Sequence, residues 1–357
     1  MLVLFIFLLG CEEPQIRNSD SIAQSKTGSY NSNDKQVVDE PIKIGFAMDT
    51  LTEERWVKDR DHFKQSVEAL GAEVEVMASH GDDALQIWQA ETMISNGIDL
   101  LVIVPHNAES TAAIVEKAHS AGIKVLSYDR LVKNAEVEMY VSYDNERVGV
   151  LQAQAITKLV PKGKYVYIGG AETDNNAHMF KKGVFEVLQP LIDKGDITVV
   201  FDQWTKDWVP SNAKENMEIA LNANHHDIDA VIAANDATAG AVIEVLEEQG
   251  LAGKIPVAGQ DADLAAIQRI VEGKQTMTIY KPINELTELA AELAIKLAKD
   301  EEIGELGEIV KVNNGKMEVP SILLSPTVVN HSNVDETIIA DGFHMKEDVY
   351  LNKGKED

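Results

Sequence analysis

Polar side chains recur in this sequence at the points where buried strands are expected to end. An apolar run at residues 230–234 ends in Asn235, and a second apolar run at 255–258 is soon followed by Asp261. Carboxylate and amide oxygens accept hydrogen bonds, whereas Arg and Lys side chains only donate them. Because a hydroxyl group does both, a crevice lined by this mixture suits a ligand that carries many hydroxyl groups.

Carboxylates, amides, cations and two tryptophans of this kind occur along most of the chain. The candidate ligand-binding residues are Arg55, Trp56, Asp129, Arg130, Asp174, Asn176, Trp208, Asn235, Asp261 and Lys281. Charge-assisted hydrogen bonds are the stronger ones, and tryptophan rings offer an apolar platform for the C–H face of a sugar. Taken singly, each Asp or Asn is more often a helix cap, and each tryptophan could equally be a core residue. The specific signal is the recurrence in both halves of the chain.

The elements that must position these residues alternate between apolar strands and helices. Strands are expected at 42–48, 72–78, 99–104, 123–128, 139–143, 164–168, 197–201, 230–234, 255–258 and 275–280. Helical patterns lie between most of them, and a long one covers 283–298. Continuous apolar strands of this kind form parallel sheets covered by helices on both faces. Such sheets bind ligands beyond the carboxyl ends of their strands.

The chain has 357 residues, enough for about two domains. The fold class that we predict is α/β, with two Rossmann-like, doubly wound lobes joined by a hinge. Residues 40–147 plus about 283–315 are assigned to the N-terminal lobe. Residues 148–282 plus about 316–350 are assigned to the C-terminal lobe, since short strands and turns in the last segment could cross back between lobes.

The N-terminus resembles a lipoprotein export signal. An apolar run precedes Leu8-Leu9-Gly10-Cys11, which is similar to a bacterial lipobox with a lipidated cysteine. The run is shorter than the ~20 residues of a spanning helix, and no Lys or Arg precedes it; the alternative is a chance apolar start with a buried cysteine. The polar segment 12–39 is expected to be a flexible tether. We therefore expect an extracytoplasmic lipoprotein anchored to the membrane through Cys11, or a periplasmic protein.

Composition and missing motifs exclude several classes of protein. The formal net charge of −27 argues against a nucleic-acid partner. No Cys or His spacing suits zinc, and neither a phosphate-binding loop nor a nucleophile elbow is found. We expect no metal, no cofactor and no enzymatic activity, although the plentiful carboxylates leave acid–base catalysis open from the residues alone.

Short motifs in a fixed order identify a family. ERW at 54–56, YDR at 128–130, DNN at 174–176, ND at 235–236, GQD at 259–261 and YKP at 280–282 together resemble the D-xylose-binding proteins of bacterial sugar ABC transporters. These belong to the ribose- and galactose-binding group of periplasmic-type proteins. The resemblance extends from about residue 41 to residue 344. The chain departs from the family in having Cys11, and in having His106 where a tyrosine is expected.

This resemblance implies a type I periplasmic-binding-protein fold that closes over one monosaccharide, D-xylose, and delivers it to an ABC permease. It implies that all the candidate residues contact the sugar, with Trp56 and Trp208 on its two faces, and that the protein is a monomer. Alternatives are a receptor for another sugar such as ribose, glucose or galactose, or a sugar sensor for a two-component kinase. A sugar-responsive transcription repressor is disfavoured, because it would need an N-terminal helix-turn-helix and a basic face. Here the N-terminus resembles an export signal followed by a tether, and the net charge is strongly negative.

Overall fold

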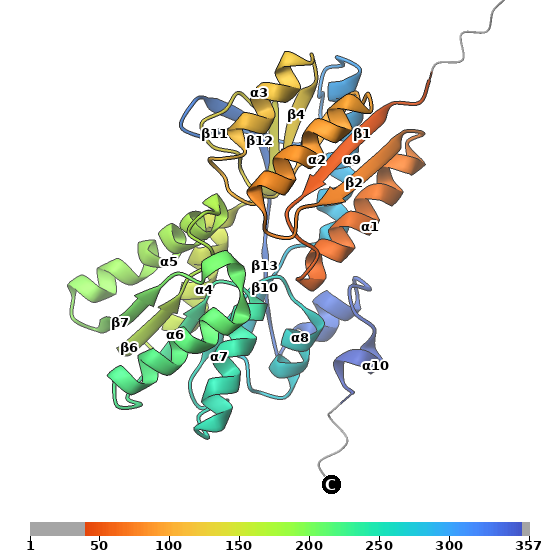
Figure 1. Cartoon of the computed structure of the whole chain (residues 1–357). Helices are drawn as coiled ribbons and strands as arrows, with labels where there is room; N and C mark the ends of the chain where they lie inside the picture. Colours follow the sequence, from red (N-terminus) through yellow and green to blue (C-terminus); the bar gives the residue numbers. More distant parts are fainter. Residues whose placement is uncertain (1–39, 352–357) are drawn as a thin grey trace, which may run out of the picture. The chain divides into compact units, whose positions relative to one another are not determined.

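The computed structural model describes residues 40–351. The predictions for Cys11, for the signal at 1–11 and for the tether at 12–39 lie outside these residues. Residues 41–351 belong to one compact unit, and these residues form two β-sheets, each with helices on both faces (Figure 1). This confirms the predicted fold class of two doubly wound α/β lobes.

The first lobe is built on a seven-stranded sheet of order β11-β12-β5-β4-β3-β1-β2. Its strands are β1 (Lys43–Met48), β2 (Glu73–Ala78), β3 (Leu100–Ile103), β4 (Lys124–Tyr128), β5 (Met139–Tyr143), β11 (Ile309–Asn313) and β12 (Glu318–Leu324). All pairings are parallel except that of β11 with β12. One face packs against α1 (Glu54–Ala69) and α9 (Ile283–Ala298), and the other packs against α2 (Asp83–Ser95) and α3 (Ala112–Ser120).

The second lobe has a six-stranded sheet of order β13-β10-β9-β8-β6-β7. Its strands are β6 (Gly163–Ile168), β7 (Ile197–Gln203), β8 (Ala230–Ala233), β9 (Val257–Ala258), β10 (Met277–Tyr280) and β13 (Thr327–Asn330). Only β13 runs antiparallel to its neighbour. The surrounding helices are α4 (Asn145–Leu159), α5 (Asn175–Asp193), α6 (Pro210–Ala223), α7 (Asp236–Glu248) and α8 (Leu264–Val271). The C-terminal helices η2 (Asp335–Ile339) and α10 (Lys346–Val349) follow β13.

Three chain segments cross between the lobes: after β5, after β10 and after β12. The sequence prediction placed the last crossing at about residue 315, which is wrong, because β12 pairs in parallel with β5 of the first sheet. The chain therefore crosses at 325–326. Two of the crossings lie side by side, since the Asp144 backbone N–H donates to the Leu324 carbonyl at 2.9 Å.

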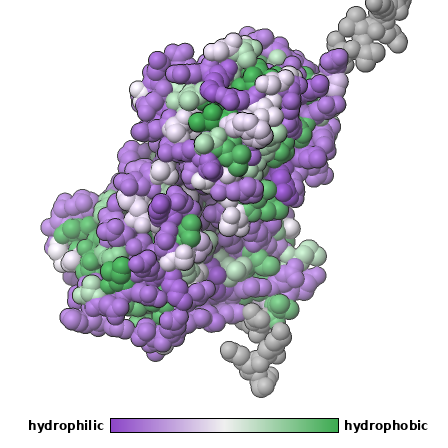
Figure 2. Space-filling view, viewed as in Figure 1, coloured by the Kyte–Doolittle hydropathy of each residue, from purple (hydrophilic) through white to green (hydrophobic). Residues whose placement is uncertain are grey.

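Buried apolar strands explain why the sheets form where they do. Every residue of β3, β5, β8 and β10 is buried, as expected for parallel strands covered on both faces. The face of the molecule in Figure 2 is mostly hydrophilic, with small scattered apolar areas. Both sheets point the carboxyl ends of their parallel strands toward the space between the lobes, and the candidate residues lie there.

Candidate functional site

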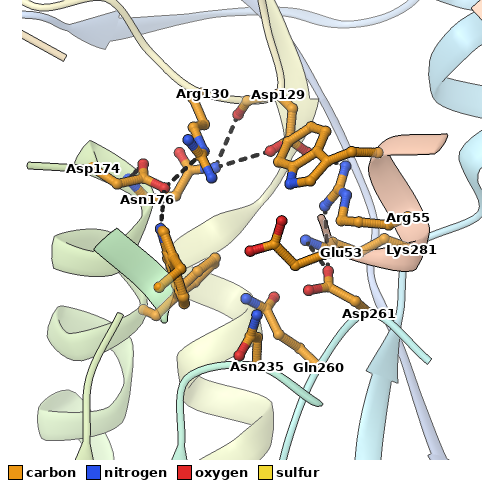
Figure 3. Close-up of a pocket in the computed structure, with 13 residues that line it drawn as sticks. Glu53, Arg55, Asp129, Arg130, Asp174, Asn176, Asn235, Gln260, Asp261 and Lys281 are labelled. Carbon is orange, nitrogen blue, oxygen red and sulfur yellow. Dashed lines mark hydrogen bonds and ion pairs between the residues drawn. The ribbon is translucent and has the colours of Figure 1, made fainter. Parts of the chain in front are cut away.

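A small cavity lies between the two lobes. Its empty volume, which includes space open to solvent, is about 330 Å³. The lining residues are Glu53, Arg55, Trp56, Asp129, Arg130, Asp174, Asn176, Phe180, Trp208, Asn235, Gln260, Asp261 and Lys281 (Figure 3). The structure thus brings together every candidate residue predicted from the sequence, from both lobes.

The Arg55 side chain is held at the cavity by three carboxylates. Its Nε lies 3.2 Å from Asp59, its Nη2 lies 2.8 Å from Asp129, and its Nη1 lies 3.2 Å from Asp261 of the other lobe. Burial alone would lower the pKa of Arg55, but these carboxylates outweigh burial and raise that pKa well above its usual value. Burial likewise opposes ionisation of Asp129, yet Arg55 and Lys281 hold the pKa of Asp129 below its ordinary value. Both groups therefore remain charged.

Arg130 forms a second bridge between the lobes. Its Nη1 donates to Oδ2 of Asp49 at 2.7 Å in the first lobe, and its Nε lies 2.8 Å from Oδ2 of Asp174 in the second. The same Asp174 oxygen accepts from Nε1 of Trp208 at 3.1 Å. Burial raises the pKa of Asp174 despite the nearby Arg130. Through these contacts, Arg130 orients the Asp174 carboxylate, and with it the Trp208 ring, toward the cavity.

Two tryptophans and Phe180 supply the apolar part of the cavity wall. The Trp56 ring has the guanidinium carbon of Arg55 4.3 Å from its centroid and that of Arg130 at 5.0 Å. Phe180 lies 5.8 Å from the ammonium group of Lys281. Flat apolar rings between charged groups suit a ligand with C–H faces and a polar edge.

Three of the cavity residues have left-handed backbone conformations. The φ angles are 59° at Asp129, 58° at Trp208 and 94° at Asp261. Such conformations are unfavourable for non-glycine residues, particularly for a bulky one, and concentrate at functional sites. The Asp129 carbonyl is held by donors from Tyr140, Ser142 and Asn176. At Asp129, these three hydrogen bonds help to offset the strain.

Helix capping, the alternative for single polar residues, applies to two of the candidates. Asp174 accepts from the backbone N–H of Asn176 at the start of α5, and Asn235 accepts from that of Thr238 at the start of α7. Both residues also line the cavity. Capping and ligand contact are compatible here because the helix N-termini themselves point at the cavity.

Several residues that complete the site were not predicted from the sequence. Glu53, Phe180 and Gln260 line the cavity without having been predicted. Asp59 is completely buried beneath Arg55 and accepts a short hydrogen bond from the Tyr128 hydroxyl. Asp59 could have been predicted as a partner of Arg55, because residues four positions apart on a helix lie next to each other on the same face.

The arrangement offers hydrogen-bond donors and acceptors around an apolar slot, which suits a small polyhydroxylated molecule. Among residues 40–351, no group of His, Cys, Asp and Glu side chains is placed to hold a metal ion. Within the same residues, no helix has the length and apolar character needed to cross a membrane.

Two α/β lobes with a polar cavity at their seam define a class of binding proteins that enclose a small ligand. The chain belongs to the periplasmic binding protein family, whose domain model matches residues 44–302.

Its relatives within that family carry a more specific description. The chain is 52% identical over 309 residues to a D-xylose-binding periplasmic protein of Haemophilus influenzae, covering 87% of this chain and 92% of the relative. It is 49% identical over 308 residues to the D-xylose-binding periplasmic protein of Escherichia coli, covering 86% of this chain and 92% of the relative. A carbohydrate transporter solute-binding protein of Chloroflexus aurantiacus, solved with D-glucose, superimposes with a TM-score of 0.79 at 31% identity, over 87% of this chain and 98% of that one.

Proposed function

We propose that this protein is an extracytoplasmic receptor that closes over D-xylose and delivers it to an ABC permease. The proposal rests on one combination of findings. The chain is about half identical to two D-xylose-binding proteins over nearly their whole length, and its candidate residues surround one small cavity.

The contacts across the cavity suggest how the ligand is enclosed. Arg55 reaches Asp261, Arg130 reaches Asp174, and Asn176 donates to the Asp129 carbonyl at 3.0 Å. Each pair joins the first lobe to the second. A sugar that hydrogen-bonds to the same groups adds to these contacts, so ligand binding shifts the population toward the closed form. No bond of the sugar is made or broken in this process.

We propose that the two lobes move as units about the three crossings. The lobes are then residues 40–144 with 283–324, and 145–282 with 325–351. This moves the predicted boundary at 147 to 144, just before α4 begins, and the predicted boundary at 315 to 324, where β12 ends. The closed pair presents both lobes at once to a permease, which allows the transporter to distinguish loaded from empty receptor.

Calorimetry with the purified protein, starting near residue 39, tests the function. We expect D-xylose to bind with a free energy of about −8 kcal/mol, which corresponds to a micromolar dissociation constant. Pentoses and hexoses form the comparison panel, and the ligand also raises the melting temperature by mass action. Absence of D-xylose binding at millimolar concentration overturns the proposed ligand.

D-Glucose is the second candidate ligand, because the structure from Chloroflexus aurantiacus contains it. A hexose carries one more hydroxymethyl group than a pentose. Tighter binding of D-glucose than of D-xylose in the same calorimetric series would assign the receptor to hexoses and leave the closing mechanism unchanged.

We also propose that Cys11 carries a lipid that anchors the receptor to the membrane. The support is the lipobox-like sequence that ends at Cys11. Expression of the full chain and of Cys11→Ser in a bacterial host tests it: the wild type is expected in the membrane fraction and the variant in the soluble fraction. Equal distribution of the two would contradict the anchor.

A further inference from the structure

Glu53 differs from the other charged residues of the cavity in having an unsatisfied oxygen. Its Oε2 atom is buried and has no hydrogen-bond partner among the described residues. The other charged lining residues, Arg55, Asp129, Arg130, Asp174, Asp261 and Lys281, each have an ion-pair partner within 3.2 Å. A buried acceptor without a partner is unfavourable, so the closed cavity is complete only when something donates to Glu53.

Glu53 stands where the inner cavity meets a wider cleft. It lines the cavity, and it also lines a cleft of about 1080 Å³ empty volume, together with Asp49, His106, Asp207 and Asp263. Figure 3 shows its carboxylate extending among the other labelled polar groups of the cavity. A ligand in the cavity therefore meets Glu53 at the edge that faces the wider cleft.

A second orphaned acceptor lies in the same wall. Oε1 of Gln260 is buried without a hydrogen-bond partner among residues 40–351, and the Gln260 side chain is almost inaccessible to solvent. Two unpaired acceptors in one small cavity indicate that the missing partner is a molecule with several donors. A sugar, whose hydroxyl groups rotate to donate, meets that requirement.

We propose that Glu53 is a specificity-determining residue that accepts a hydrogen bond from a sugar hydroxyl at the edge of the ring facing the wider cleft. This inference rests on the proposed function and names the residue that discriminates among sugars at that edge. An ionised carboxylate only accepts. A sugar with no donor at this edge leaves Glu53 buried and unpaired, and is therefore disfavoured.

The electrostatic surroundings of Glu53 agree with this role. Burial raises the pKa of Glu53, and Asp49 and Asp261 add to that effect, whereas Arg130 opposes it. A donated hydrogen bond from a ligand stabilises the charged carboxylate. In the free site the charged form of Glu53 is thus disfavoured, and a hydroxyl group that donates to the carboxylate stabilises that form.

Matched variants and deoxy sugars test the inference. Glu53→Leu removes the acceptor, Glu53→Gln keeps one acceptor oxygen, and Glu68→Gln on the exposed side of the same helix is the control. Each protein is titrated calorimetrically with D-xylose and with its four monodeoxy analogues, including 1,5-anhydroxylitol, and thermal unfolding verifies that each variant folds.

The expected result is a specific pairing between Glu53 and one hydroxyl group. Glu53→Leu should weaken D-xylose binding by about tenfold or more, Glu53→Gln by less, and Glu68→Gln should leave it unchanged. For one deoxy analogue, Glu53→Leu should bind at least as tightly as the wild type, because the hydroxyl that Glu53 accepts from is gone and only the wild type is left with an unpaired carboxylate.

Two outcomes overturn the inference. The first is an unchanged D-xylose affinity in folded Glu53→Leu. The second is that Glu53→Leu binds every deoxy analogue more weakly than the wild type by the same factor, which would mean that Glu53 has only a structural role. Wild-type binding of D-xylose tests the proposed function separately. If the wild type prefers another sugar of the panel, the monodeoxy analogues of that sugar are used in place of those of D-xylose. The inference about Glu53 is then judged by the same two outcomes for that sugar.

Discussion

Oδ1 of Asp261 in the second lobe lies 3.2 Å from Nη1 of Arg55 in the first lobe and 2.7 Å from Nζ of Lys281. One carboxylate oxygen thus joins two buried cations, and of the two only Arg55 forms ion pairs with further carboxylates among residues 40–351. Lys281 is 4% exposed, so loss of Asp261 would remove the ion-pair partner of a buried ammonium group. Asp261 thus links a cation of the first lobe to a cation of the second lobe.

Asp261→Ala is therefore expected to weaken D-xylose binding by about 2 kcal/mol or more, roughly thirtyfold in the dissociation constant. The loss combines a missing acceptor for the sugar with a buried ammonium group left without its ion pair. Calorimetry measures the change, and Asp227→Ala, which removes an exposed surface pair with Lys164, is the control. Equal affinity in Asp261→Ala and the wild type would contradict the site assignment.

Asp59 is expected to hold Arg55 in position without contacting the ligand itself. It is fully buried and joins the Tyr128 hydroxyl to Nε of Arg55. Asp59→Ala should lower the free energy of unfolding by about 3 kcal/mol or more, because a buried guanidinium loses one of its partners. Urea unfolding measures this. Glu68→Ala on the same helix, at an exposed position, should change stability by no more than about 0.5 kcal/mol; equal effects of the two substitutions would argue against a buried ion pair.

Much of the site was predictable because parallel sheets impose it. The carboxyl ends of parallel strands meet at one edge, so residues that follow apolar runs, such as Asp129 and Asn235, had to converge. Trp56 could be placed only with the help of the family resemblance, since an amphipathic helix reveals which side chains are buried but not what they face.

The features that could not be predicted depend on contacts between distant parts of the chain. The pairing of β12 with β5 decides to which lobe the segment after residue 315 belongs, and no local pattern encodes that choice. Glu53 at the start of α1 looks like an ordinary acidic residue of a helix N-terminus. Its carboxylate borders a cavity lined by residues of both lobes, which no local sequence pattern reveals.

Gly170 is expected to control the position of the Trp208 ring. A Cβ atom added at Gly170 would lie 2.0 Å from that ring, so Gly170→Ala must displace Trp208 from the cavity wall. D-Xylose binding should weaken by about tenfold or more, as for loss of a central aromatic contact. Gly240→Ala is the matched control, because its new Cβ meets only the end of the Arg269 side chain, at 3.1 Å.

Calorimetry and thermal unfolding together separate the two possible effects of Gly170→Ala. Reduced affinity with a melting temperature close to that of the wild type supports displacement of the ring alone. Unchanged affinity in a folded Gly170→Ala protein would mean that Trp208 contributes little to ligand binding.

His106 gives the stability of the protein a pH dependence of predictable sign. Its Nδ1 lies 2.9 Å from Oδ1 of Asp49, whose other oxygen accepts from Arg130. The hydrogen bond to Asp49 raises the pKa of His106 above its usual 6.5, with Asp83 adding to the effect and burial and Arg130 opposing it. The protonated histidine is thus favoured in the folded state. Its contribution to stability is fully present below pH 6.5 and is lost as the pH rises through the raised pKa.

His106→Asn removes the titrating group and tests this sign. The difference in unfolding free energy between wild type and variant is expected to be largest near pH 5.5 and to decrease toward about pH 8. Asp49 stays ionised throughout this range, because His106 and Arg130 outweigh burial and lower its pKa. Urea unfolding at several pH values measures the difference. A difference that stays constant, or grows toward alkaline pH, would show that His106 is not held in its protonated form by Asp49.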